Sequence, residues 1–308
     1  MILCCGEALI DMIPTPTTTD REGFVPHSGG AVFNTAIALG RLGVDAGFFS
    51  GISNDLFGAQ LVSDLEHSHV ATRYVARSDR PTTLAFVQLI NGQARYAFYD
   101  ENTAGRLLEP ADLPQFDTRP KAFYFGGISL VAEPAAQVYA QLCQQVASES
   151  VVMIDPNIRQ SFIQDEARYR ARLDTMFAAA DIIKVSDEDL EWISGSADIP
   201  RGARALMDSG AQIVLVTQGA QGAVAYQPDH DPVHVASVPT QVVDTVGAGD
   251  SYNAGFLASL ERANMLSKTA LNHVTSTQLS EAMQLAAKVA SVTVSRAGAN
   301  APWADELT

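Results

Sequence analysis

Short apolar runs alternate with helical patterns along most of this 308-residue chain, and this alternation constrains the fold more than any other feature. Because strands that alternate with helices build a mostly parallel sheet covered on both faces, the sequence predicts one α/β domain over residues 1–308. The expected buried strands are 2–5, 46–50, 122–125, 151–154, 182–185 and 213–217. The expected helices are 32–42, 58–66, 134–146, 168–179, 201–209, 250–262 and 280–295.

Two segments, at about 9–27 and 72–100, break this rhythm and alternate with a period of two, as half-buried strands do. Within the second segment, Asn91-Gly92 predicts a hairpin turn leading into residues 94–99. We expect these segments to form a small β-sheet lid that rises from the main domain. Such a lid could cover a cleft and exclude water.

The formal net charge of -15 argues against a nucleic-acid partner, because phosphate backbones require a basic surface. An anionic ligand would instead be held by a few local cations, backbone amides and a metal. Cys4, Cys5 and Cys143 have no framework spacing, which favours buried, reduced thiols in a cytoplasmic protein. There is no basic segment before the short apolar N-terminal run and no stretch of membrane-spanning length, so we expect neither a signal peptide nor a membrane partner.

The most informative segment is the run of small residues between Asp244 and Asp250, which opens a helical pattern. A glycine-rich turn at a helix start directs free amides and the positive end of the helix dipole at one point, where an anion is stabilised. Gly247, Ala248 and Gly249 would form this anion hole, and Asp250 would lie in the first helical turn beside it.

Asp250 is therefore placed to accept a proton from a hydroxyl that attacks a phosphoryl group held by the amides. We expect the helix dipole to keep the Asp250 carboxylate ionised and a weak base, which phosphoryl transfer tolerates. The structural alternative, a capping acid after a plain turn, explains single residues but not the whole segment.

Residues 244–250 resemble the C-terminal signature of the ribokinase-like (PfkB) family of carbohydrate and nucleoside kinases, and residues 29–34, Gly-Gly-Ala-Val-Phe-Asn, resemble its N-terminal signature. The resemblance covers essentially the whole chain. It implies a ribokinase-like fold, ATP and Mg²⁺ as cofactors, Asp250 as catalytic base and Gly247, Ala248 and Gly249 as the anion hole.

At the sugar end, Asp11 follows the first strand and can accept hydroxyl hydrogen bonds, Gly29 and Gly30 allow close backbone approach, and Asn34 offers a donor and an acceptor. Arg159 follows the strand at 151–154 and could reach the substrate or the phosphoryl group, or pair with a carboxylate. The lid would add Arg95, Phe98 and Tyr99 near the sugar, although aromatic residues at strand spacing also serve packing.

The opening at residues 6–11 and the run from residue 155 to Arg159 resemble the fructokinase branch, which implies transfer to the 6-hydroxyl of fructose. A 2-keto-3-deoxygluconate kinase is the alternative. Asp100 and Glu101 should repel its acidic substrate, although Arg95 and Arg106 weaken this reasoning. A catalytically silent sugar- or nucleotide-binding regulator is an alternative of another class.

At the nucleotide end, the resemblance assigns Thr217, Gly219 and Gly222 to the ATP phosphates and ribose, and Gly247 and Gly249 of the anion hole would also bind ATP. Lys184 could approach the nucleotide or be a solvated strand-end lysine. The sequence departs from the family pattern in two places. Ser186 and Asp189 replace an Asn-x-x-Glu stretch, leaving Asp189 to act on Mg²⁺ through water, and Ala287 replaces an asparagine near the adenine.

The resemblance further implies a monovalent cation, with K⁺ activation as a hypothesis, and a homodimer formed through the lid. The expected cation ligands are Asp244 and the backbone carbonyls of Val246, Thr293, Arg296 and Gly298.

Overall fold

The computed structural model of the protein describes residues 1–18, 21–90 and 93–307, without the side chains of residues 22 and 88–96. A nine-stranded sheet forms its centre. Its strand order is β15-β14-β13-β12-β11-β10-β1-β4-β6, parallel from β13 to β6, with β14 and β15 added antiparallel at one edge. The strands are β1 (Ile2–Cys5), β4 (Ala46–Phe49), β6 (Val70–Ala71), β10 (Ala122–Gly126), β11 (Val151–Asp155), β12 (Ile182–Ser186), β13 (Ile213–Thr217), β14 (Ala223–Tyr226) and β15 (Val233–Val235).

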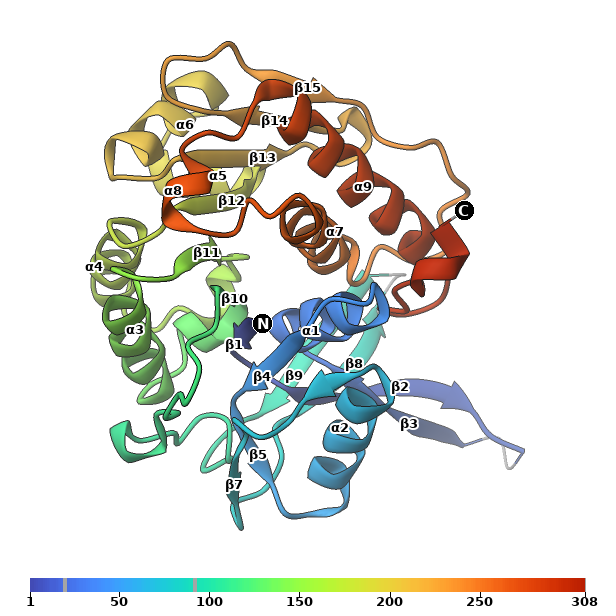
Figure 1. Ribbon diagram of the computed structural model, residues 1–308. Coiled ribbons are helices and arrows are strands. Elements are labelled where there is room, and N and C mark those ends of the chain that lie inside the picture. The colour runs from blue at the N-terminus through green and yellow to red at the C-terminus, as the bar shows by residue number, and fades with distance from the viewer. Residues whose placement is uncertain (19–20, 91–92, 308) are drawn as a thin grey trace.

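Helices cover both faces of this sheet, so the main domain has three layers (Figure 1). One layer contains α1 (Ala31–Arg41), α2 (Leu56–His67), α7 (Ala248–Arg262), α8 (Lys268–Leu271) and α9 (Ser276–Val294). The other contains α3 (Ala135–Val146), α4 (Glu166–Phe177), α5 (Asp187–Ser194) and α6 (Ile199–Asp208). Because strand side chains alternate, Ile2 and Cys4 enter one core while Leu3 and Cys5 enter the other.

All six expected strands and seven expected helices are present, and the α/β ribokinase-like fold class is confirmed. The short elements α5, α8, β5, β6, β7 and β15 were not predicted. Helices α2 and α9 begin earlier than expected, because polar side chains cap them. Asp55 accepts a hydrogen bond from the Gly58 amide at 2.8 Å before α2, and Thr275 and Gln278 form a reciprocal capping box at the start of α9. Short 3₁₀ turns complete the chain: η1 (Pro110–Asp112), η2 (Gly127–Leu130), η3 (Gln160–Phe162), η4 (Gly219–Gln221) and η5 (Ala304–Leu307).

A separate four-stranded sheet, the lid sheet, extends away from the main domain (Figure 1). Its order is β3 (Glu22–Gly29), β2 (Leu9–Pro16), β8 (Leu84–Ile90) and β9 (Gln93–Tyr99), with only β2 and β8 parallel among its neighbouring strands. The predicted Asn91-Gly92 turn lies outside the described residues.

The lid prediction was wrong for residues 72–83. In that stretch β7 (Ala76–Ser78) pairs with β5 (Gly51–Ser53) in a two-stranded sheet, and the lid sheet resumes only at Leu84.

The three cysteines are free and buried, as expected, and desolvation raises the pKa of each thiol. Within the described ranges, no helix combines the length and the apolar character needed to cross a membrane.

Candidate active site

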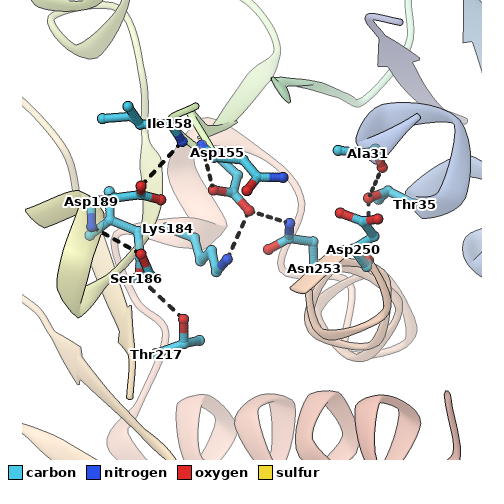
Figure 2. Close-up of polar contacts among 12 residues, drawn as sticks. Ala31, Thr35, Asp155, Ile158, Lys184, Ser186, Asp189, Thr217, Asp250 and Asn253 are labelled. Carbon is cyan, nitrogen blue, oxygen red and sulfur yellow. Dashed lines mark hydrogen bonds and ion pairs between the residues drawn. The ribbon is translucent and has the colours of Figure 1, made fainter. Parts of the chain in front are cut away.

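The candidate site lies where the carboxyl ends of the central parallel strands meet the starts of α1 and α7. Ligands of open α/β sheets bind at this edge. Figure 2 shows the side chains that gather there: Asp155 from β11 and Lys184 from β12 point toward Asn253 of α7, with Asp250 nearby facing α1.

The glycine-rich turn opens α7 as the sequence indicates. Gly247 is the N-cap residue with φ of 78°, a left-handed conformation, and no side chain caps the helix. Ala248 is the first helical residue. The backbone amides of Gly249 and Asp250 have no hydrogen-bond partner within the described part of the chain. These amides and the helix dipole can therefore stabilise an anion at this point, which we call the anion site.

The Asp250 carboxylate is buried beside these amides, with the residue only 6% exposed. Burial raises its pKa to about 7, and the negative charges of Asp155 and Glu7 act in the same direction. The hydrogen bond from Asn34 and the Lys184 charge act in the opposite direction. The expectation that Asp250 stays ionised is therefore wrong near and below neutral pH, because desolvation favours the protonated carboxyl group.

Two α1 residues hold Asp250 from the opposite side. Asn34 Nδ2 donates to Asp250 Oδ2 at 2.9 Å, and Thr35 Oγ1 donates to the Asp250 carbonyl oxygen at 3.2 Å. Asn34, predicted as a sugar contact, thus has a contact with the Asp250 carboxylate that sequence reasoning missed. Its Oδ1 atom remains available to a ligand.

One face of the lid sheet carries Asp11. The strand registers pair Asp11 with Ala85 and Ala85 with Phe98, which places all three side chains on one face. Phe98 contacts Phe162 of η3 edge-on with ring centroids 4.4 Å apart, so this face is directed at the main domain. Desolvation raises the pKa of Asp11 to about 6, and no hydrogen bond engages its carboxylate within the described residues. Asp11 therefore presents a free acceptor on the inner face of the lid.

Gly29 and Gly30 are required by contacts inside the protein itself. A Cβ atom at Gly29 would lie 2.3 Å from Asp11 Oδ2, and one at Gly30, where φ is 110°, would lie 2.7 Å from the Glu7 carbonyl oxygen. Glu7 in turn accepts from the amides of Ala31 at 3.0 Å and Ser129 at 3.1 Å, joining the start of α1 to η2. Glu7 was not singled out from the sequence, although it lies inside the recognised opening segment.

The outer face of the lid sheet carries Tyr99, which was predicted to lie near the sugar. Tyr99 is 63% exposed and packs edge-on against Phe86, which packs against Phe24. That prediction was wrong, because side chains alternate along β9, so Tyr99 lies on the face opposite to Phe98. The contact predicted for Arg95 concerns a side chain outside the described residues.

Asp100 is part of a compensated network. It accepts hydrogen bonds from Thr83 at 2.8 Å and Thr103 at 2.9 Å and pairs with Arg106 at 3.4 Å. The expectation that Asp100 repels an acidic sugar is weakened, because Arg106 offsets its charge.

A largely apolar cavity of about 550 Å³ opens on the other side of the anion site. Of the residues assigned to the nucleotide, Thr217, Gly219, Gly222 and Gly249 line it, together with Ala248 and Ala287. Gly222 has φ of 94°, and a Cβ there would lie 2.2 Å from the Val235 carbonyl oxygen, so a side chain would obstruct this turn.

Lys184 does not line this cavity and is not the solvated strand-end residue considered as an alternative. It is 5% exposed, and its Nζ atom contacts Asp155 Oδ2 at 2.9 Å. Asn253 Nδ2 donates to the same oxygen at 2.7 Å and to the Tyr124 hydroxyl oxygen at 3.0 Å. Asp155 and Asn253 were missed. The available signal was an acid and a lysine at the ends of neighbouring parallel strands.

Asp189 and Arg159 occupy the outer part of this edge. Asp189 is buried, its Oδ1 accepts from the Ile158 amide at 3.2 Å, and burial raises its pKa. Arg159 is exposed and donates to the carbonyl oxygen of Ile158 at 3.2 Å. Neither contact assigns the residue to a ligand.

The segments expected to hold a monovalent cation lie side by side. Asp244 accepts from the Gly298 amide at 2.9 Å and from the Val246 amide at 3.0 Å. The Thr293 carbonyl accepts from the Arg296 amide at 3.1 Å, and the Arg296 side chain pairs with Glu306. Asp244 therefore joins the two segments.

Comparisons with known proteins agree with this architecture. The model of pfkB family carbohydrate kinases matches residues 1–306. A fructokinase of Rhizobium leguminosarum bv. trifolii is 50% identical over 268 residues, 87% of this chain and 82% of that protein. A fructokinase of Klebsiella pneumoniae is 35% identical over 263 residues, 83% of this chain and 82% of that protein. The structure of Xylella fastidiosa fructokinase with bound ATP superimposes with a TM-score of 0.90 at 27% identity, covering 99% of this chain and 96% of that one. The chain belongs to the pfkB family of carbohydrate kinases, within its fructokinase branch.

Proposed function

We propose that the protein transfers the γ-phosphoryl group of ATP to the 6-hydroxyl of fructose. The observation that carries this proposal is the buried Asp250 carboxylate next to two free amides at the start of α7, between the inner face of the lid and the apolar cavity. A base and an anion site at one point are the parts that phosphoryl transfer to an alcohol requires.

In this mechanism Asn34 keeps Asp250 Oδ2 occupied, so Oδ1 is the atom that takes the proton of the attacking hydroxyl. A pKa of about 7 suits that task, because a base near the operating pH combines correct ionisation with proton affinity. The amides of Gly249 and Asp250 stabilise the charge of the transferring phosphoryl group.

Asp11 would accept hydrogen bonds from sugar hydroxyls on the inner face of the lid. The nucleotide would fill the 550 Å³ cavity, with Thr217, Gly219 and Gly222 at its rim. Closure of the lid over the sugar would exclude water and limit ATP hydrolysis.

Magnesium would neutralise phosphate charge when it enters with ATP. Among the described residues no group of three metal-ligating side chains occurs, which fits a cation held mainly by phosphates and waters. Asp189 would act on magnesium through a water, with Oδ2 as the oxygen that does not accept the Ile158 amide.

We also propose a K⁺ site between the segments that Asp244 joins, a homodimer formed through the lid, and a cytoplasmic location. The dimer proposal is supported by the exposed side chains of Phe24, Val25 and Tyr99 on the lid sheet. A monomer in sedimentation at micromolar concentration would refute the dimer.

ADP release from Mg·ATP, measured separately with fructose, glucose, ribose, adenosine and 2-keto-3-deoxygluconate, tests the proposed function. Turnover mainly with fructose is expected. Turnover mainly with the sugar acid would favour the second candidate, which the pairing of Asp100 with Arg106 leaves open. Binding without turnover would indicate a silent regulator.

A further inference from the structure

A buried charged cluster lies beneath the anion site. Asp155 is 1% exposed, Lys184 is 5% exposed and Asn253 is 0% exposed. Lys184 Nζ and Asn253 Nδ2 both contact Asp155 Oδ2 (Figure 2). The other carboxylate oxygen, Oδ1, accepts the Asn157 amide at 3.2 Å. With both oxygens engaged by the protein, Asp155 has no free side for a substrate.

The ammonium of Lys184, in contrast, lies directly against the anion site. A Cβ atom built on Gly249 would be 3.3 Å from Lys184 Nζ, so a side chain at this position would crowd the ammonium. Gly249 also supplies one of the two free amides. The cation therefore lies close to the residue that supplies this amide.

We propose that Asp155, assisted by Asn253, is a positioning residue that fixes the Lys184 ammonium at the anion site for phosphoryl transfer. This inference rests on the proposed kinase function. A cation already held in place does not need to reorganise as charge develops on the phosphoryl group, which is where electrostatic catalysis gains most. Asn253 also joins this cluster to α7, one helical turn after Asp250.

The cluster also acts on the base. Four groups influence the Asp250 carboxylate: Asn34 by a hydrogen bond, and Asp155, Lys184 and Glu7 by their charges. Because Asp155 raises the pKa of Asp250 and Lys184 lowers it, removing either charge should move the acidic limb of the pH–rate profile, in opposite directions.

The test uses the full chain and compares wild type with Asp155→Asn, Lys184→Met and the double variant. We expect Asp155→Asn to lower kcat about 10- to 100-fold, as loss of supporting partners of functional groups does. We expect Lys184→Met to lower kcat about 100- to 1000-fold, as loss of an electrostatic stabiliser does. The acidic limb should move to lower pH in Asp155→Asn and to higher pH in Lys184→Met.

The double variant is decisive when kcat is compared on the alkaline plateau, where Asp250 is ionised in every variant and the charge of Asp155 no longer affects the base. There, a residue that acts on the phosphoryl group only through Lys184 has nothing left to position. Its kcat should equal that of Lys184→Met. The inference would be overturned if the losses of kcat multiplied in the double variant, or if Asp155→Asn kept the wild-type kcat. It would also be overturned if the acidic limb did not move in Asp155→Asn and Lys184→Met. A wild-type protein that turns over no sugar would instead overturn the proposed function.

The matched control is Asp181→Asn. Asp181 pairs with Lys268 at 2.7 Å and accepts a hydrogen bond from the Val152 amide. It comes directly before β12, at the amino-terminal ends of the strands and away from the candidate site. This variant should lower Tm without changing kcat or the acidic limb.

If Asp155→Asn does not fold, Asn253→Ala is the milder variant, because it keeps the ion pair between Asp155 and Lys184. A lower kcat with an unmoved acidic limb is then expected, and a wild-type kcat would overturn the inference.

Discussion

Asn34 Nδ2 donates to Asp250 Oδ2 at 2.9 Å and joins the start of α1 to the start of α7, across 216 positions of the chain. The two signature segments recognised in the sequence therefore meet at one hydrogen bond. The orienting group and the base come from different helices, so the site exists only when both helices are packed.

The free enzyme should lose activity below neutral pH. With the pKa of Asp250 raised to about 7, kcat/KM should fall tenfold for each unit below that value, because the protonated acid cannot accept the hydroxyl proton. A pH profile of kcat/KM for fructose, measured with Mg·ATP below saturation, checks this. A profile flat down to pH 5 would show that Asp250 remains ionised.

Replacing Asp250 with Asn should lower kcat about 10²- to 10⁴-fold and raise stability at alkaline pH. Ionisation of a buried acid whose pKa is raised destabilises the native state as pH increases from about 4 to about 7. The Tm of Asp250→Asn relative to wild type should therefore increase over this window and level off above it. Near-normal turnover would contradict the assignment of the base.

Replacing Asn34 with Ala should move the acidic limb to higher pH. The hydrogen bond from Asn34 favours the ionised carboxylate, so its loss raises the pKa of Asp250 further. Thr35→Val is the control, because the Thr35 hydroxyl contacts Asp250 at its backbone carbonyl oxygen and not at its carboxylate. It should lower Tm but leave the limb in place. Equal shifts in both variants would point to a general disturbance of α1.

Replacing Gly249 with Ala should reduce kcat with little loss of stability. The residue lies in the first turn of α7 without a positive φ, and Ala is a better helix former than Gly. The new Cβ would lie 3.3 Å from Lys184 Nζ and displace the ammonium. Thermal melts and kcat measured on the same preparation separate these effects. Unchanged kcat would show that the ammonium tolerates displacement.

Activity should depend on K⁺ through Asp244. Exchange of K⁺ for a bulky organic cation should lower kcat in wild type but not in Asp244→Ala, in which the segments at Val246 and Gly298 are no longer joined. Titration of each protein with KCl at constant ionic strength checks this. Equal activity of the wild type in both salts would refute the K⁺ site.

The sequence alone predicted the layered α/β architecture, because the alternation of apolar runs and helical patterns reports which residues are buried along each element. It also placed the anion site at the start of α7, since a small-residue turn before a helix is a local feature. Short elements such as β7 escaped detection because their pairing with β5 is long-range.

The tertiary structure decided the properties that depend on distant neighbours. Burial is the largest cause of the raised pKa of Asp250, and burial is produced by residues from several elements. Strand alternation turned Tyr99 outward although Phe98 beside it faces inward. The pairing of Asp155 with Lys184 depends on the register of β11 and β12, which no local pattern reveals. The sequence thus determined which chemical groups are present, and packing decided which of them meet and how strongly each holds its proton.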